Sequence, residues 1–291
     1  MKISELKTRF QLELADVFNE NERNGIWQYV MDFVFEISST QLFIEPNLAV
    51  SHDTKQVFDT LIERLKNKEP IQYITGSAYF YDSVFRVNPS VLIPRPETEE
   101  LVSNVLKSFQ KKGCRILDIG TGSGCIAVSL KKARQDAELT AVDISEAALD
   151  VAKQNAEEIC GTQSVNFILA DVLSEDFGNL LETKFEIIVS NPPYIPIIEK
   201  PQLAENVLQF EPHLALFCEN DPLLFYRAIA LHSSTLLTSG GLIFFEIHEN
   251  FGHLILKLLK DLNFENVQLI KDFQGKDRMV KATKNYDKKT T

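Results

Sequence analysis

The sequence is poor in the residues that build metal sites, disulfide frameworks and membrane anchors. Its 291 residues include four cysteines and five histidines, and neither set shows metal-ligand spacing. The cysteines are widely scattered and form no Cys-x-x-Cys pair, so we expect neither a zinc site nor a disulfide framework. No stretch approaches the roughly 20 apolar residues that a membrane helix requires. We therefore expect no metal and no membrane partner.

Positive charge is also scarce. The chain carries 30 Lys and Arg against 41 Asp and Glu, which gives a formal net charge of −11. Nucleic-acid binders usually need a basic patch, because neutralisation of phosphates dominates their affinity. The short basic runs at 111–112, at 131–132 and in the tail from 281 to 289 are typical of solvated faces. The composition argues against direct nucleic-acid binding and favours a protein partner, especially a basic one.

The remaining composition is that of a globular protein. Apolar residues make up 44% and charged residues 24% of the chain, and the length suffices for one large domain plus a small one. The first residues are amphipathic and lack the continuous apolar core of a secretory signal, so we expect a cytoplasmic protein. Nothing indicates an obligate dimer, and a monomer is expected.

The chain changes character twice along its length. Apolar residues recur at helical spacing near the N-terminus, for example at Leu6 and Phe10. Residues 79–88 are instead rich in aromatic and β-branched side chains, and residues 91–96 extend that pattern. The predicted parts are an N-terminal helical domain at 1–75, a β-hairpin linker at 76–96 and a larger α/β domain at 97–291.

Helix-like and strand-like segments alternate in the last part. A helix is expected to begin near Thr98, whose hydroxyl could cap it. Apolar strands are expected at 115–119, 138–142, 165–169, 185–189 and 242–247, with a closing pair at 267–272 and 278–283. This series predicts an α/β fold with a doubly wound, mainly parallel, seven-stranded Rossmann-like sheet, which would bind ligands at the carboxyl ends of its strands.

A glycine-rich turn follows the first of these strands. The turn, Gly120-Thr121-Gly122-Ser123-Gly124, opens a helix, and the next strand ends at Asp143. Glycines let a ligand approach the backbone closely, and an acid about 20 residues further on is placed to accept hydrogen bonds from ribose hydroxyls. By itself the turn is compatible with NAD, a flavin, S-adenosylmethionine or a purely structural role. Asp143 could also simply cap the following helix.

The strand at 185–189 leads into a second motif, Asn191-Pro192-Pro193-Tyr194. The Asn191 side chain and the Pro192 carbonyl can each accept an N–H, and the prolines stiffen the loop. The Tyr194 ring offers a flat face for a planar amide or base. An amino group held in this way keeps electron density on its nitrogen and can attack an electrophilic methyl group. Together with the glycine turn, this loop favours S-adenosylmethionine as the cofactor.

With these motifs in place, the sequence resembles the bacterial peptide chain release factor glutamine methyltransferases, the PrmC/HemK family. The resemblance covers nearly the whole chain from Pro70 onward, whereas the N-terminal part matches in pattern more than in residues. The segments that carry it are Pro70–Gly76, Val91–Glu99, Asp118–Gly124, Asp143–Ser145, Asn191–Ile195 and Glu211–Leu216.

The resemblance implies a methyltransferase sheet and a specific reaction. A methyl group would pass from S-adenosyl-L-methionine to the side-chain amide nitrogen (N5) of the glutamine in the Gly-Gly-Gln loop of class I peptide chain release factors. S-adenosyl-L-homocysteine would be the product. The implied catalytic and substrate-binding residues are Asn191, Pro192, Pro193 and Tyr194. The implied cofactor-binding residues are Asp118, Gly120, Thr121, Gly122, Ser123, Gly124, Asp143, Asp171, Val172 and Asn191.

The resemblance also implies separate roles for the acids of the cofactor site. Asp118 would help to orient the methionine amine, Asp143 would hold the ribose, and Asp171 would face the adenine amino group. Val172 stands where the family often has an aromatic residue.

Two other functions remain as alternatives. An N6-adenine methyltransferase could use the same loop for a base amino group, although the acidic composition counts against it. A non-catalytic binding module could keep the fold, although the intact glycines, Asp143 and the Asn191 loop count against that. No side-chain base is evident near the loop, so we expect catalysis by positioning. Arg95 and Glu97 are expected to form an interdomain ion pair rather than to contact the substrate.

Overall fold

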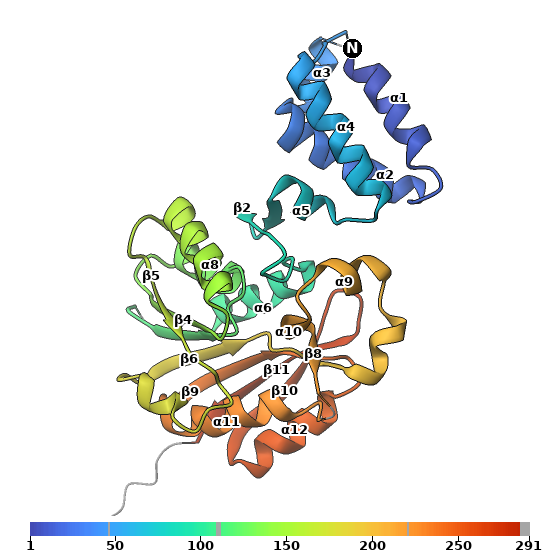
Figure 1. Ribbon diagram of the computed structural model, residues 1–291. Helices are drawn as coiled ribbons and strands as arrows, with labels where there is room; N and C mark the ends of the chain where they lie inside the picture. Colours follow the sequence, from blue (N-terminus) through green and yellow to red (C-terminus); the bar gives the residue numbers. More distant parts are fainter. Residues whose placement is uncertain (46, 109–111, 220, 286–291) are drawn as a thin grey trace, which may run out of the picture. The chain divides into compact units, whose positions relative to one another are not determined.

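A computed structural model describes residues 1–45, 47–108, 112–219 and 221–285 (Figure 1). Lys111 and the part of the basic tail beyond residue 285 therefore lie outside the described residues. The chain divides into two compact units. The first comprises residues 1–77, 87–89 and 204–210, and the second comprises the other described residues.

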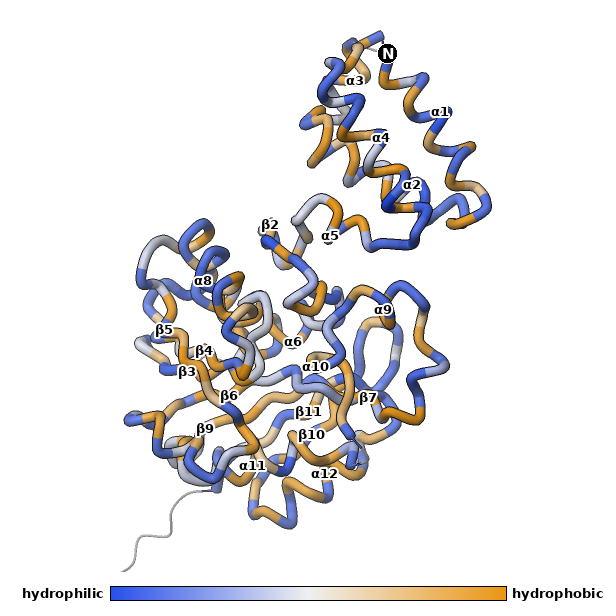
Figure 2. Tube along the Cα trace, in the orientation of Figure 1, coloured by the Kyte–Doolittle hydropathy of each residue, from blue (hydrophilic) through white to orange (hydrophobic). Residues whose placement is uncertain are grey.

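The first unit is built from helices. They are α1 (Ile3–Glu13), α2 (Glu20–Val30), α3 (Ser39–Ile44), α4 (His52–Lys66), α5 (Ile71–Thr75) and α9 (Glu205–Phe210), and a π-helical turn at Met31–Phe35 prolongs α2. Hydrophobic and hydrophilic stretches alternate along α1 and α4 (Figure 2), as expected of helices with one buried face. In the core, Trp27 contacts the rings of Phe10, Phe35 and Phe58 at centroid distances of 5.3, 5.8 and 6.4 Å. The prediction of helices in this region is confirmed.

A short β-hairpin follows α5, as predicted. Its strands are β1 (Ser77–Phe80) and β2 (Ser83–Arg86). The two turn residues, Tyr81 and Asp82, have φ angles of 44° and 56°, and positive φ at both positions is what a type I′ hairpin turn requires. The expectation that residues 91–96 extend the hairpin is wrong, because they form no strand. Pro94 cannot donate to a ladder, and Pro96 instead opens the next helix at its first position.

The second unit contains a seven-stranded sheet formed by described residues. Its order is β10-β11-β9-β6-β3-β4-β5, and β11 alone runs antiparallel to its neighbours. The strands are β3 (Arg115–Ile119), β4 (Glu138–Asp143), β5 (Val165–Leu169), β6 (Phe185–Ser190), β9 (Leu237–Glu246), β10 (Phe264–Lys271) and β11 (Asp277–Lys284). The predicted doubly wound, mainly parallel seven-stranded sheet is therefore confirmed.

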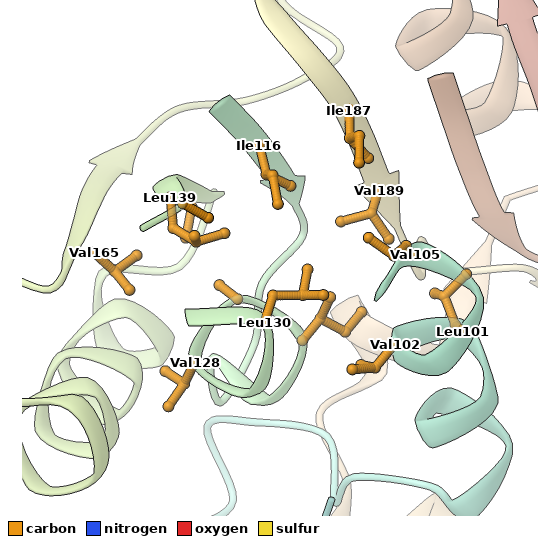
Figure 3. Packing of buried hydrophobic residues seen from close by; sticks show 14 of the residues in the cluster. Leu101, Val102, Val105, Ile116, Val128, Leu130, Leu139, Val165, Ile187 and Val189 are labelled. Carbon is orange, nitrogen blue, oxygen red and sulfur yellow. The ribbon is translucent and has the colours of Figure 1, made fainter. Parts of the chain in front are cut away.

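Helices cover both faces of this sheet. They are α6 (Pro96–Lys107), α7 (Cys125–Ala133), α8 (Glu146–Cys160), α11 (Leu224–Leu236) and α12 (Gly252–Asp261). Successive residues of a strand point to opposite faces, so Ile187 and Val189 of β6 join one core whereas Ile188 joins the other. The first core includes residues of α6, α7 and α8, and Figure 3 shows Leu101 and Val105 of α6 among its members. The second core packs against α11 and α12.

Smaller elements follow β5 and β6. They are a 3-10 turn at Phe177–Leu180, β7 (Ile195–Pro196), a 3-10 turn at Ile197–Gln202, α10 (His213–Leu216) and β8 (Phe217–Cys218), which pairs with β7. None of the helices in the described part of the chain combines the length and the apolar character needed to span a bilayer. The described residues also contain no cluster of three or more His, Cys, Asp or Glu side chains suited to a metal ion.

Candidate functional site

A cavity of about 380 Å³ lies at the carboxyl ends of neighbouring parallel strands in the second unit. Strand β3 pairs with β4 on one side and with β6 on the other, so the order of the strands reverses there. Open α/β sheets bind their ligands at such a point. The lining includes Gly120–Ser123 after β3, Asp143–Ser145 at the end of β4, Ala170–Leu173 after β5 and Ser190–Pro193 after β6. The glycine turn and the Asn-Pro-Pro segment, far apart in sequence, thus line one cavity.

The three glycines of the turn have two different structural roles. All have positive φ, at 74° for Gly120, 55° for Gly122 and 80° for Gly124. A Cβ atom on Gly120 or Gly122 would meet nothing within 4 Å, whereas one on Gly124 would lie 3.1 Å from the Cβ of Ala152 in α8. The first two glycines therefore leave space for a ligand in the cavity they line, and Gly124, which is not among the lining residues, lets α7 and α8 pack closely.

Asp143 lies in the cavity wall with its carboxylate held by the backbone. Its Oδ2 accepts a hydrogen bond from the N–H of Gly122 at 2.8 Å, and its Oδ1 accepts one from the N–H of Ser145 at 2.9 Å. Each carboxylate oxygen has a further lone pair for a ligand hydroxyl. Burial raises the pKa of this carboxyl. The alternative that Asp143 caps the next helix is wrong, because Ser145 is the N-cap of α8 and accepts from the N–H of Ala148.

Asp118 is fully buried at the base of the glycine turn and is not among the lining residues. Its Oδ2 accepts a hydrogen bond from the Thr121 hydroxyl at 2.7 Å, and Thr121 does line the cavity. Its Oδ1 makes no hydrogen bond with any described residue. Burial raises the pKa of Asp118 to about 7. Its predicted contact with a methionine amine stays a prediction.

The loop after β5 forms another part of the wall. Asp171 and Val172 both line the cavity, and Asp171 Oδ1 accepts from the N–H of Leu173 at 2.8 Å. Their predicted contact with adenine stays a prediction. Sequence reasoning missed Phe225, which lines the cavity from α11. Phe225 brings an aromatic ring to a cavity in which Val172 provides none, but its position in an amphipathic helix gave no signal of this role.

Asn191, Pro192 and Pro193 line the cavity, and a continuous hydrogen-bond chain holds the first of them. The Asn191 Nδ2 donates to Thr98 Oγ1 at 3.3 Å, and Thr98 Oγ1 donates to Glu246 Oε2 at 2.7 Å. The Tyr194 hydroxyl donates to the other oxygen, Glu246 Oε1, at 3.4 Å. Tyr194 is not among the lining residues, so its predicted packing on a substrate amide stays a prediction.

Glu246 and Thr98 are the principal residues that sequence reasoning missed. Glu246 ends β9 with only 1% of its surface exposed, and burial raises its pKa to about 7. Thr98 was expected to cap α6. The helix instead begins at Pro96 with Arg95 as its N-cap, so Thr98 lies inside the first turn with its hydroxyl buried against Glu246. The acid that ends the apolar segment 242–247 was the available signal for Glu246.

Arg95 forms an ion pair, as expected, but not with Glu97. Its Nη2 lies 2.5 Å from Oε1 of Glu211, whose side chain is almost fully buried. The Glu211 Oε2 also accepts a hydrogen bond from the N–H of Ile93 at 3.4 Å. Both partners belong to the second unit, so the expectation of an interdomain pair is wrong. Glu211 fixes the wall segment that carries Pro94 and Arg95, both of which line the cavity.

Known proteins match both parts of the chain. Residues 97–210 match the methyltransferase small domain family, and residues 5–76 match the PrmC N-terminal domain family. The release factor glutamine methyltransferase of Flavobacterium psychrophilum is 41% identical over 288 residues, which cover 97% of this chain and 99% of that protein. The release factor glutamine methyltransferase of Bacteroides thetaiotaomicron is 41% identical over 272 residues, which cover 93% and 96%.

Solved structures share the sheet architecture. A methyltransferase from Pyrococcus furiosus has a TM-score of 0.51 with this chain at 19% identity, covering 69% of this chain and 88% of that one. An identity this low bears on the fold alone.

Proposed function

Because this chain belongs to the family of release factor glutamine methyltransferases, we propose that it methylates a glutamine side chain of a class I peptide chain release factor. The methyl group comes from S-adenosyl-L-methionine and goes to the N5 nitrogen of the glutamine in the Gly-Gly-Gln loop. One observation carries this proposal. The Asn-Pro-Pro segment, suited to hold a planar amide, and the glycine turn, suited to a nucleoside-bearing cofactor, line the same cavity.

The residues around the cavity fit the cofactor. Gly120 and Gly122 leave open space where side chains would stand, and Asp143 keeps acceptor capacity for ribose hydroxyls. We assign the adenine to the wall formed by Asp171 and Val172. The methionine end is assigned to Thr121 with its hydrogen-bond partner Asp118. When bound, the cofactor supplies an electrophilic methyl group on a sulfonium.

The chain's own residues compensate for the weak nucleophilicity of the glutamine amide nitrogen. A carboxamide nitrogen has its lone pair delocalised into the carbonyl. The Asn191 side-chain oxygen and the Pro192 carbonyl would each accept one N–H of the glutamine amide and so fix the direction of its nitrogen. Correct orientation alone contributes about 7–11 kcal/mol in favourable cases. The same two acceptors stabilise the positive charge that develops on the nitrogen, and the proton leaves after transfer.

The other parts of the assignment concern the setting of the reaction. We place the helical domain at 1–75, a linker that contains the β1–β2 hairpin at 76–96 and the methyltransferase domain at 97–291. The release factor is the protein partner, the chain acts as a monomer, and S-adenosyl-L-homocysteine is the product. Release factors work on ribosomes, which supports a cytoplasmic location.

A methyl-transfer assay tests the proposal. The full chain is incubated with cofactor tritiated on its methyl group and with a class I release factor, the same factor carrying Gln→Ala in its Gly-Gly-Gln loop, or duplex DNA. We expect label in the intact release factor alone. Label in DNA would support an adenine methyltransferase, label in the loop variant would place the modification elsewhere, and absence of label in all three would refute the proposed activity.

A further inference from the structure

The proposed function depends on the orientation of the Asn191 side-chain amide, and the role assigned below to its neighbours rests on that function. The oxygen and nitrogen of an Asn side chain have nearly the same shape, so either atom could face a substrate. Only the oxygen can accept an N–H from a glutamine amide. If the nitrogen faced the substrate, its own N–H donors would point at the N–H donors of the glutamine. A residue that determines which atom faces the cavity therefore determines whether the site works.

The hydrogen-bond chain from Asn191 to Glu246 settles this choice. An ionised carboxylate has no hydrogen to donate, so the Thr98 hydroxyl must donate its single hydrogen to Glu246 Oε2, at 2.7 Å. The Thr98 oxygen is then left with lone pairs only, and it accepts from Asn191 Nδ2 at 3.3 Å. With its nitrogen engaged in this way, Asn191 presents its oxygen for the substrate.

We propose that Thr98 and Glu246 are positioning residues that fix the Asn191 side chain with its amide oxygen toward the substrate amide. Neither residue exchanges a proton or a methyl group with the substrate. Thr98 lines the cavity beside Asn191, whereas Glu246 is not among the lining residues and acts through Thr98.

The surroundings of Glu246 suit this role. Its side chain is buried at the end of β9, and its second oxygen accepts from the Tyr194 hydroxyl at 3.4 Å. Arg278 of β11 acts on it as a positive charge and Glu97 of α6 as a negative one. The Tyr226 hydroxyl of α11 donates a hydrogen bond to the Glu246 backbone carbonyl at 3.1 Å and so holds the backbone of this residue in place. Glu246 is therefore held by groups from several helices and strands, and it provides a fixed end for the hydrogen-bond chain.

Protonation of Glu246 would remove the constraint. A neutral carboxyl can donate to Thr98, whose hydroxyl is then free to donate to Asn191 and to turn the amide nitrogen toward the substrate. Burial raises the pKa of Glu246 to about 7. Turnover at saturating cofactor should therefore rise with pH through an acidic limb near neutrality. Glu246→Gln should change that limb because its amide does not titrate in this range, whereas the titration of Asp118, whose pKa is also raised to about 7, is common to both chains.

The test uses the full chain with a release factor as substrate. Thr98→Val keeps the shape of the side chain but removes its hydroxyl, and Thr98→Ser restores the hydroxyl. We expect Thr98→Val to lower kcat at least about tenfold, with KM and the Kd for S-adenosyl-L-homocysteine within about twofold of the parent, because the hydrogen bond that holds the Asn191 amide is lost. Thr98→Ser should recover most of the lost turnover. Thr235→Val, at an exposed site in α11, is the matched control and should leave activity unchanged.

A double-mutant cycle shows whether Thr98 acts through Asn191. In an Asn191→Ala background, Thr98→Val should cause no further loss, since there is no amide left to orient. A kcat for Thr98→Val within twofold of the parent, or full additivity with Asn191→Ala, would overturn the inference. If Thr98→Val does not fold, the pH profile of Glu246→Gln decides instead, and an unchanged acidic limb would overturn it. An inactive parent chain would refute the proposed function itself, which is a separate outcome.

Discussion

We propose that Asp143 and Asn191 both act as hydrogen-bond acceptors in the site, but for different molecules. Asp143 ends β4 and is held by the N–H groups of Gly122 and Ser145, in the half of the cavity made by the glycine turn. Asn191 follows β6 and is held through its amide nitrogen by Thr98. Substituting each residue should therefore change a different measured quantity, cofactor affinity in one case and turnover in the other.

Asp143→Ala should weaken cofactor binding by about 10- to 100-fold, because hydrogen bonds to a charged acceptor contribute about 1.5–3 kcal/mol. Calorimetric titration with S-adenosyl-L-homocysteine measures the change. Asp150→Ala, on the exposed side of α8, removes an acid from the same region and should leave affinity unchanged. An unaltered affinity in Asp143→Ala would refute the assignment of the ribose to this residue.

Asn191→Ala should lower kcat by at least about 100-fold, the usual effect of losing one group that stabilises developing charge. Its Kd for S-adenosyl-L-homocysteine should remain close to that of the parent chain, since the side chain is proposed to hold the substrate amide. Steady-state methylation kinetics and calorimetry on the same preparation provide both numbers. Equal losses of affinity and turnover would show that Asn191 serves the cofactor instead.

At the scale of elements, the connection from β3 through the glycine turn to α7 combines a ligand surface with a packing contact. Gly120 and Gly124 have similar positive φ angles, 74° and 80°, so alanine would be strained at both positions to a similar extent. Their surroundings differ, because only Gly124 faces α8 at short range. Substitutions at Gly120 and Gly124 can therefore distinguish the proposed ligand-binding role of the turn from its packing role.

Gly124→Ala should destabilise the fold more than Gly120→Ala does, by about 1–3 kcal/mol beyond the shared backbone strain, because its Cβ would press on Ala152. Gly120→Ala should instead cause the larger loss of cofactor affinity, since its Cβ would occupy space in the cavity wall. Urea denaturation and calorimetric titration of both variants measure the two effects. The reverse order in either measurement would contradict the division of roles between the glycines.

The elements were more predictable from the sequence than their contacts. Strands such as 115–119 and 185–189 can be predicted because they are apolar runs, and the glycine turn can be predicted from its composition. The Thr98–Glu246 hydrogen bond joins residues 148 positions apart, and no local pattern contains such a pair. The prediction that Thr98 caps α6 was wrong for a related reason. Pro96 starts α6 two residues earlier, and tertiary contact with β9 gave the hydroxyl another partner.

At the scale of the whole molecule, acidic residues with raised and with lowered pKa values have opposite effects on stability. One group consists of exposed acids such as Asp136, whose pKa is lowered chiefly because the hydrogen bond from its ion-pair partner Arg134 favours the charged form. The buried acids Asp118 and Glu246 have pKa values raised to about 7, chiefly by burial. Retaining two buried carboxyls at this cost in stability fits a site whose polar groups serve ligands rather than the fold.

This contrast predicts how stability changes with pH. A carboxyl whose pKa is higher in the folded than in the unfolded chain binds its proton more tightly when folded, so its contribution to the free energy of unfolding is full below pH 4 and is lost as pH rises to about 7. For Asp118 the loss between pH 4 and pH 8 should be about 2–4 kcal/mol. Asp118→Asn cannot titrate, so its stability relative to the parent should increase over that range by the same amount. Urea denaturation at pH 4, 5, 6, 7 and 8 measures the difference, in which the effects of the surface ion pairs common to both chains cancel. Asp150→Asn, an exposed substitution, should show no such trend. A constant difference between Asp118→Asn and the parent across these pH values would show that Asp118 titrates in the folded protein as it does in the unfolded chain.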